Sequence, residues 1–192
     1  LRQAYVGVLE ILVKYLESTD PYTRGHSERV SEHAMDIAVA LELPRQEVEN
    51  IRVAALLHDI GKVEISAELI GKAASLTEEE VAEVAEHSEK GARLLQSVGS
   101  VLNNAVPIVL EHHQYFTQMD APTDGALTLS SLGTRIVAVA DSFDAMTTDR
   151  PYRKGVQPWQ ALEELKRHRG KQFDPEVVDA FASVVAQKLE KV

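Results

Sequence analysis

The sequence predicts an all-α protein, on three observations. Apolar residues recur at helical spacing through most of the 192 residues. No stretch of any length alternates between apolar and polar side chains as a half-buried strand would. Proline or a capping residue stands where many of the apolar stripes begin or stop. We therefore expect a bundle of about eight or nine helices, without internal repeats.

The first three helices are expected close together in the chain. Residues 1–18, LRQAYVGVLEILVKYLES, predict an amphipathic helix. Asp20-Pro21 either ends it or begins a second helix over residues 21–43, because proline is favoured in the first helical turn. Pro44 opens a third helix that leads into the stretch VAALLHDIGK.

The remaining helices have clear starts. Thr77 and Glu80 form the pattern of a capping box, which begins a helix that carries His87. Residues 101–114 predict another apolar helix, and residues 115–130, rich in Thr, Asp, Gly and Pro, predict a loop. The last three helices are expected over 134–144, from Pro158, and from Asp174-Pro175 to near Lys191.

Composition limits the classes of function. The chain has no cysteine, so His, Asp and Glu must hold any metal, which favours Fe, Mn, Zn, Co or Ni. A net charge of −10 argues against a nucleic-acid polymer as partner. No run approaches the ~20 apolar residues of a membrane span, and no secretory start is visible, so we expect a cytoplasmic location. The chain opens at Leu1 within a helical pattern, which suggests a piece of a longer protein.

The pair His58-Asp59 is the centre of the predicted site. An imidazole nitrogen and two carboxylate oxygens side by side are metal ligands, and a carboxylate can bridge two cations. The alternative is a buried, hydrogen-bonded histidine whose helix is capped by Gly61. The rest of the chain decides between them, because further ligands lie beside apolar helical stripes or at helix ends. These candidates are His26, His58, Asp59, His87, His112, His113 and Asp141.

Adjacent histidines indicate two metals. His112 and His113 cannot easily serve one ion from a regular helix, but they can serve two neighbouring ions, with Asp59 between them. That is the pattern of a two-metal hydrolytic site, with ions ~3.5–4 Å apart and a hydroxide between them. His33 and His168 stand among charged residues, and we interpret both as surface residues or as supports behind the ligands.

Several segments together resemble the HD superfamily of phosphohydrolases and, within it, the HD-GYP domain of bacterial signalling proteins. The segments that carry the resemblance are YTRGHSERV (22–30), LLHDIGK (56–62), EHSEKGARLL (86–95), EHH (111–113), RIVAVADSFDAMTTDRPYR (135–153) and KQFDPEVV (171–178). The resemblance implies a domain over residues 21–192, preceded by a linker or signalling helix over residues 1–20. It implies the seven metal ligands named above and hydrolysis of cyclic di-GMP to linear pGpG and/or GMP.

The resemblance also implies two divalent ions, with Fe or Mn favoured and Zn, Co or Ni as alternatives. Some three-metal members carry a glutamate one turn before the first histidine, where this chain has Tyr22, which favours two metals. The resemblance to a domain of signalling proteins leads us to expect fusion to a sensory or receiver domain upstream. The apolar stripe of residues 1–18 suggests homodimer formation through that helix.

The chain departs from the family at the GYP motif. Residues 114–125 read QYFTQMDAPTDG, where the family usually has Glu-Arg and then Asp-Gly-x-Gly-Tyr-Pro-x-Gly. We expect this loop to form one wall of the mouth of the site and to weaken the preference for cyclic di-GMP. Tyr115 and Phe116 either stack on a guanine or fill the edge of the core.

Four further residues have candidate roles in catalysis or substrate binding. Asp59 and Lys62 are assigned to the reaction, with Lys62 neutralising phosphate charge or assisting the leaving group, unless it is a solvated helix-end cation. Asp144 orients the nucleophile or a ligand histidine, or else caps a helix or pairs with Arg150. Arg150 and Arg153 suit phosphate binding because guanidinium is a planar fork of donors, although surface ion pairs are an alternative.

Three functions therefore stay open. The first is a cyclic di-GMP phosphodiesterase, and the second is a phosphohydrolase of another nucleotide or cyclic dinucleotide. The third is a module that binds a ligand or a partner without turnover, against which the complete ligand set argues.

Overall fold

The computed structural model describes residues 2–17, 24–72, 76–118, 129–149 and 153–189. These residues form helices and connecting turns, and no strand occurs among them beyond an isolated bridge between Arg169 and Phe173. The all-α prediction is confirmed. The described chain has nine α-helices longer than one turn, together with the single-turn α4 and three short 3-10 helices.

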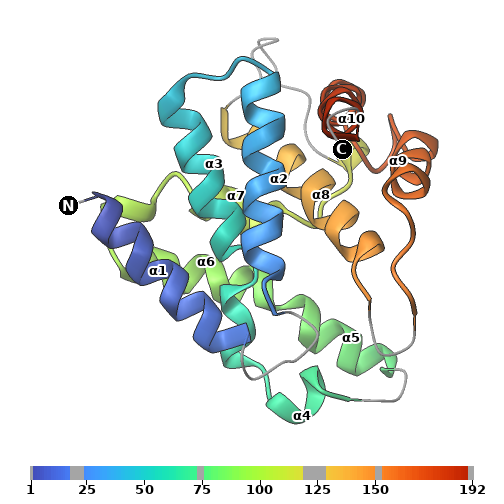
Figure 1. Ribbon diagram of the computed structural model, residues 1–192. Helices are drawn as coiled ribbons and strands as arrows, with labels where there is room; N and C mark the ends of the chain where they lie inside the picture. Colours follow the sequence, from blue (N-terminus) through green and yellow to red (C-terminus); the bar gives the residue numbers. More distant parts are fainter. Residues whose placement is uncertain (1, 18–23, 73–75, 119–128, 150–152, 190–192) are drawn as a thin grey trace.

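The bounds of the helices follow the chain order shown in Figure 1. The α-helices are α1 (Arg2–Glu17), α2 (His26–Ala40), α3 (Arg45–Leu57), α4 (Ala67–Ile70), α5 (Glu78–Ala85), α6 (His87–Ser97), α7 (Val106–Glu111), α8 (Leu129–Thr147), α9 (Pro158–Arg167) and α10 (Pro175–Leu189). The 3-10 helices are η1 (Ile60–Glu64), η2 (Ser100–Leu102) and η3 (Phe116–Gln118).

Helix α2 lies at the centre of the bundle and packs against α3 and α8 (Figure 1). Its inward stripe includes Val30 and Ile37, which are completely buried, and Val137 of α8 is buried as well. Helices α9 and α10 cover α8 on the side away from α3, with Phe181 in the core. Each fully buried Val, Ile or Phe contributes about 1.5–3 kcal/mol, so the core holds the site on a rigid frame.

The predicted helix that begins at Thr77 and carries His87 is two helices. The capping box is confirmed, because the Thr77 hydroxyl accepts from the Glu80 backbone amide and the Glu80 carboxylate accepts from that of Thr77. Helix α5 then ends at Ala85, and α6 starts at His87. The break has a local cause, since the His87 ring bonds the Val84 carbonyl. It places His87 at a helix start.

Other boundaries differ from the expected ones. The expected helix over 101–114 is limited to α7, which has proline in its first turn and ends immediately before His112. Helix α8 is longer than the expected 134–144 and begins inside the expected loop 115–130. Most of that loop, residues 119–128, lies outside the described residues. The expected second helix over 21–43 is α2, and the part of it before residue 24 also lies outside the described residues.

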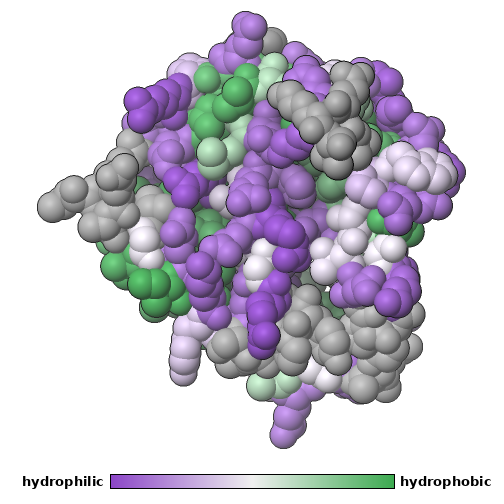
Figure 2. Space-filling model, viewed as in Figure 1, coloured by the Kyte–Doolittle hydropathy of each residue, from purple (hydrophilic) through white to green (hydrophobic). Residues whose placement is uncertain are grey.

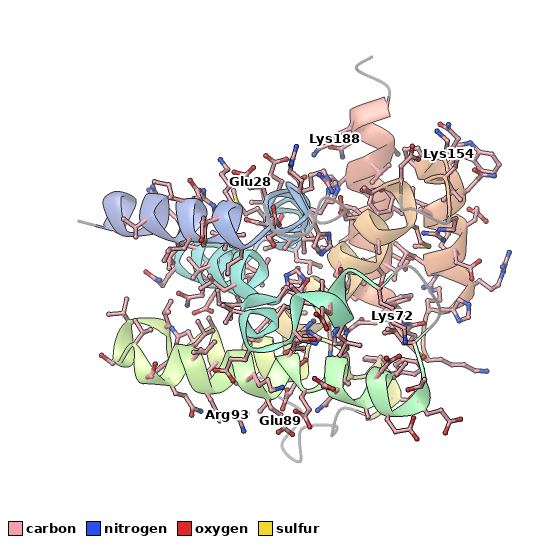
Figure 3. All side chains as sticks on the ribbon, turned by 90° about the horizontal axis from the view of Figure 1, so that it is seen from below. Glu28, Lys72, Glu89, Arg93, Lys154 and Lys188 are labelled. Carbon is pink, nitrogen blue, oxygen red and sulfur yellow. The ribbon has the colours of Figure 1, made fainter. Side chains whose placement is uncertain are left out.

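Helix α1 has two apolar faces. Leu9 and Val13 are buried against the bundle, near α3 and η1. A second stripe is exposed at i, i+3, i+4 and i+7, and hydrophobic side chains gather on the surface over this helix (Figure 2). The exposed stripe consists of Val8, Ile11, Leu12 and Tyr15. Seen from below, α3 lies between α1 on one side and α6 on the other (Figure 3).

Within the described ranges, no helix combines the length and the apolar character that crossing a bilayer requires.

Candidate metal centre

Helix ends bring the predicted ligands together. His26 is the first residue of α2, and His87 is the first of α6. His58 and Asp59 follow the last residue of α3, and His112 and His113 follow the last residue of α7. Asp141 comes from the middle of α8. All seven predicted ligands therefore converge, from five helices.

Gly61 makes this convergence sterically feasible. A Cβ added at Gly61 would lie 1.9 Å from the backbone oxygen of His87 and 2.5 Å from the backbone nitrogen of Gly91. Only glycine permits η1 to approach the first turns of α6 so closely. The glycine of the HDIGK segment thus sets the distance between His58-Asp59 and His87.

The ligands form two groups. In the first, Nε2 of His26 lies 3.3 Å from Asp141 Oδ1 and 3.9 Å from Asp59 Oδ2. His58 belongs to the same group, with its Nε2 3.5 Å from Asp59 Oδ2 and 4.0 Å from Asp141 Oδ1. Such distances between donor atoms suit a shared ion.

The second group consists of three imidazoles. His87 Nε2 lies 3.4 Å from His112 Nε2 and 3.2 Å from His113 Nε2. His87 and His112 are buried, whereas His113 is exposed, so this group opens toward solvent on the side of His113. Three nitrogens from two helices suit a second ion.

Asp59 joins the two groups. Its Oδ2 faces His26 and His58, while its Oδ1 lies 3.4 Å from Nε2 of His87. One carboxylate therefore has an oxygen toward each group, which is the arrangement that a bridging ligand needs.

The rings are held so that Nε2 points into the site. Nδ1 of His58, His87 and His112 each lies 2.7 Å from the backbone carbonyl oxygen three residues earlier, in Ala55, Val84 and Val109 respectively. A hydrogen bond of this kind fixes the tautomer with hydrogen on Nδ1 and leaves Nε2 free as a ligand. The shared geometry is one that metal-binding histidines commonly have.

The electrostatics differ between the groups. Burial opposes the charged form of His26, but the hydrogen bonds to Asp141 and Asp144 outweigh it and raise the pKa of His26 to about 9. Burial likewise opposes ionisation of Asp59 and Asp141. The electrostatic interactions with His58 and Lys62 nevertheless hold the pKa of Asp59 well below its usual value, and the hydrogen bond with His26 lowers the pKa of Asp141. The first group is therefore anionic at its two carboxylates.

In the second group, burial is the main cause that lowers the pKa of each imidazole: His87, His112 and His113. These rings are neutral near pH 7. Neutral imidazole is the ligand form, so this group can take a cation without first losing a proton.

A family comparison agrees with this donor set. The model of the HD domain family matches residues 10–177, most of the chain. The chain belongs to the HD domain family. The expected resemblance is therefore confirmed, and metal-dependent hydrolysis is the chemistry that this family and this set of ligands have in common.

Relatives of this HD domain are cyclic dinucleotide phosphodiesterases by name. "Cyclic di-GMP phosphodiesterase PA4108" of Pseudomonas aeruginosa is 37% identical over 170 residues, covering 88% of this chain and 41% of the relative. "Cyclic di-GMP phosphodiesterase" of Thermotoga maritima is 38% identical over 188 residues, covering 96% of this chain and 49% of the relative. The chain thus spans about half the length of the curated relatives it matches.

A solved structure supports the same fold. The cyclic GMP-AMP specific phosphodiesterase V-cGAP3 of V. cholerae superposes with a TM-score of 0.60 at 31% identity, covering 97% of this chain and 42% of that one. The HD-domain helical bundle expected from the sequence is therefore confirmed.

Two residues of this HD domain support the ligands from behind. Asp144 Oδ2 lies 2.7 Å from Nδ1 of His26, on the opposite side of the ring from Asp59 and Asp141. Arg29 holds Asp144 in turn, with Nε donating to Oδ1 at 2.6 Å and Nη2 donating to Oδ2 at 3.0 Å. Of the roles left open for Asp144, these contacts favour orienting a ligand histidine. Arg29 received no role in the sequence analysis.

The basic residues that were predicted to bind phosphate lie in different places. Lys62 donates to Asp59 Oδ2 at 2.6 Å, so it lies at the metal groups and is more than a solvated helix-end cation. Arg153 is exposed, and its Nη2 donates to the backbone oxygen of Ala145 at 2.8 Å. Arg150 lies outside the described residues.

The two remaining histidines differ from each other. His168 is a surface residue, as expected, with Nε2 3.0 Å from Glu164 Oε1. His33 is half-buried, and its ring meets Phe143 and Phe181 edge to face, with centroids 5.2 and 5.5 Å apart. The ring of His33 therefore packs at the edge of the core, against Phe143 of α8 and Phe181 of α10.

The two aromatic residues at the start of the rewritten loop make different contacts. Tyr115 lines a cavity together with His113, Asp141 and Gln172, beside the metal groups. Phe116 instead lies under the Arg135 guanidinium, 4.9 Å from the ring centroid. Of the two open roles, filling the edge of the core is what the contacts support for Phe116, whereas Tyr115 is placed to meet a ligand.

Proposed function

We propose that this HD domain is a metal-dependent phosphodiesterase that hydrolyses cyclic di-GMP to linear pGpG and/or GMP. The observation that carries the proposal is Asp59, whose two oxygens face two separate groups of metal-ligating side chains. Isolated buried histidines do not require such an arrangement, but a binuclear hydrolytic centre does.

The site fits two divalent ions, of which Fe or Mn is favoured and Zn, Co or Ni would also suit the donors. His26, His58 and Asp141 would hold one, and His87, His112 and His113 would hold the other, with Asp59 shared. Ions of this kind, when bound, lower the pKa of a coordinated water to near neutral and draw charge from a phosphate oxygen.

The chain's own residues supply orientation and charge. The carboxylate of Asp59 fixes the spacing between the two groups, and Asp144 keeps the His26 ring turned toward them. Lys62 lies where it can release Asp59 to the ions and then neutralise a phosphate or its leaving oxygen. Arg150 and Arg153, in the segment after α8, are proposed to bind the distal phosphate of the substrate.

We infer that the cavity beside His113 determines which substrate the domain prefers. The cavity beside Asp141 is lined by Tyr115 and the polar side chains of Gln114, Ser142 and Gln172. An aromatic ring with amide groups suits a nucleobase, which offers a flat face and hydrogen-bonding edges. The rewritten loop starts here, so we expect a weaker preference for cyclic di-GMP than in members with an intact GYP motif.

A second candidate substrate is a mixed cyclic dinucleotide. The V. cholerae relatives "3'3'-cGAMP-specific phosphodiesterase 3" and "3'3'-cGAMP-specific phosphodiesterase 2" are 33% and 30% identical to this chain. Relatives of similar identity thus differ in the base that their names specify, so membership of the family does not by itself decide the substrate. A non-catalytic binding module is disfavoured because a metal-ligating side chain stands at all seven predicted positions and the fold brings the seven side chains together.

We further propose that residues 1–20 form a signalling segment and residues 21–192 the catalytic domain, with a sensory or receiver domain upstream. The exposed apolar stripe of α1 then pairs with the same stripe of a second copy, as in a parallel coiled coil. A cytoplasmic location follows from the proposed substrate, which is a cytoplasmic signal.

Product analysis tests the function. The chain is reconstituted anaerobically with Mn²⁺ or Fe²⁺ and offered cyclic di-GMP, 3'3'-cGAMP and a generic phosphodiester in parallel. We expect cleavage of all three, with linear products from both cyclic dinucleotides. Cleavage of the generic ester alone would contradict the substrate, and cleavage of none by a fully loaded chain would favour the binding module.

A further inference from the structure

Glu17 is a buried carboxylate that is not among the predicted metal ligands or their supporting residues. It is the last residue of α1 and is only 7% exposed. Its Oε2 accepts from the backbone amide of Gly25 at 2.6 Å, and its Oε1 accepts from that of Ser27 at 2.8 Å. Burying a carboxylate is costly unless it is hydrogen-bonded, and here both oxygens are satisfied by the first turn of α2.

The residue between these two amides is His26. Glu17 therefore fixes the backbone on both sides of a predicted metal ligand, while Asp144 fixes its ring. Gly25 has a positive φ of 71°, so the chain enters α2 through a turn that glycine tolerates and that the two hydrogen bonds hold. The position of the His26 ring thus depends on a side chain from α1.

A further contact between α1 and α2 lies on the surface. Lys14 pairs with Glu28 at 2.8 Å, but both are exposed, and Figure 3 shows Glu28 on the surface beside α1. Exposed pairs contribute little to stability. A cavity lies under the end of α1, with Val13 and Leu16 on one wall and Asp59 and Lys62 on the other. The end of α1 therefore has space to shift relative to the metal groups.

We propose that Glu17 is a positioning residue for His26 and couples the position of α1 to metal binding in the first group. The proposal rests on the proposed metal centre. A displacement of α1 pulls the Glu17 carboxylate from the Gly25 and Ser27 amides, which frees the first turn of α2 and turns His26 away from Asp59 and Asp141. By linkage, metal binding in turn fixes α1 more firmly.

The test is Mn²⁺ binding by Glu17→Gln, measured by titration calorimetry on the whole chain. Glutamine has nearly the same shape but replaces one acceptor with an NH₂ group that faces a backbone donor. We expect about tenfold weaker binding of one ion, as for other residues behind metal ligands, and unchanged binding of the second ion. Faster hydrogen exchange at the Gly25 and Ser27 amides should accompany it.

Two matched variants separate this role from general stability. Glu10→Gln removes a 2.9 Å ion pair between α1 and Arg52 of α3 and keeps the Glu17 carboxylate that accepts from Gly25 and Ser27. Glu80→Gln removes the 2.6 Å ion pair with Lys72 at the start of α5, a helix that carries no predicted ligand. Both should bind Mn²⁺ as the wild type does, even where the thermal unfolding temperature falls.

An unmutated chain provides an independent measurement. Adding Mn²⁺ should slow hydrogen exchange at the Gly25 and Ser27 amides, because metal binding and the Glu17 hydrogen bonds stabilise the same turn. Wild-type affinity for Mn²⁺ in Glu17→Gln, or amide exchange that Mn²⁺ does not slow, would overturn the positioning role of Glu17. Neither result would contradict the proposed metal centre. Failure of the wild type to take up metal would contradict both proposals.

Discussion

Asp144 Oδ2 lies 2.7 Å from Nδ1 of His26, although the two residues are 118 positions apart in the chain. The contact ties the first residue of α2 to the buried face of α8 and leaves Nε2 of His26 directed at Asp59 and Asp141. A carboxylate behind a ligand histidine fixes the tautomer and raises the basicity of the ligating nitrogen.

Replacing Asp144 with Asn should therefore weaken Mn²⁺ binding in the first group by about 10–100-fold, because the amide keeps the shape but loses the charge. Titration calorimetry measures the effect. Asp36→Asn is the control, since Asp36 lies on α2, the helix that starts at His26, but pairs with Lys188 at the surface. Equal affinities in the two variants would contradict the role of Asp144.

Metal binding should become stronger as the pH rises toward 9. The pKa of His26 is raised to about 9 in the metal-free site, so at lower pH a proton occupies the nitrogen that the ion needs. Displacing one proton makes the apparent affinity rise about tenfold per pH unit below that pKa, and the rise should level off above it.

Calorimetry at pH 7.5 in two buffers of different ionisation enthalpy counts the protons released. We expect close to one proton from the first group in the wild type. Asp144→Asn should release fewer, because it removes one of the hydrogen bonds that raise the pKa of His26. An affinity that does not change between pH 6.5 and 8.5 would contradict the charge state assigned to His26.

Gly61→Ala should destabilise the fold and disturb the second group of ligands. The added methyl group would meet the backbone of His87, which cannot rotate aside as a side chain does, so η1 and α6 must separate. We expect a loss of at least about 2 kcal/mol in urea unfolding, together with weaker Mn²⁺ uptake.

Gly7→Ala is the matched control, because no heavy atom lies within 4 Å of the added Cβ and the residue is inside α1. That change should be neutral or add up to about 1 kcal/mol of stability. A Gly61 variant as stable as the Gly7 variant would show that the close approach of η1 to α6 is not required.

Tyr115→Ala should raise the KM for cyclic dinucleotides by about tenfold while leaving cleavage of a generic phosphodiester unchanged. The ring lines the cavity beside His113 and Asp141, where stacking on a base contributes about 1–3 kcal/mol. Phe116→Ala should instead lower stability and affect both substrates equally, because its ring packs on Arg135. Steady-state kinetics on both variants decide whether the start of the rewritten loop binds substrate.

The sequence predicts the helical class, and it predicts candidate ligands that the fold brings together, for physical reasons. Apolar periodicity reports the buried face of each helix, and ligands at the junction of apolar and polar residues, such as His58 and Asp59, must lie at the edge of the core. The break between α5 and α6 was missed because it depends on a side-chain bond from His87 to the Val84 carbonyl, which no periodicity reveals.

Residues that act through long-range contacts were also missed. Arg29 reaches Asp144 across 115 positions, and Glu17 caps a helix that starts nine residues later. In a sequence, both look like ordinary surface charges of an amphipathic helix. The packing of His33 was missed for the converse reason, because its charged sequence neighbours give no sign of the two phenylalanines that its ring contacts.

The most direct test of the account is the metal content of the chain measured together with its hydrolysis of cyclic di-GMP, in the wild type and in Asp59→Asn. After anaerobic reconstitution and removal of free metal, we predict close to two ions per wild-type chain and release of a linear product. In Asp59→Asn, the loss of the shared carboxylate should remove at least one ion and abolish turnover. Two ions and full activity retained in Asp59→Asn, or a wild type that binds two ions and cleaves nothing, would contradict a hydrolytic centre built around Asp59.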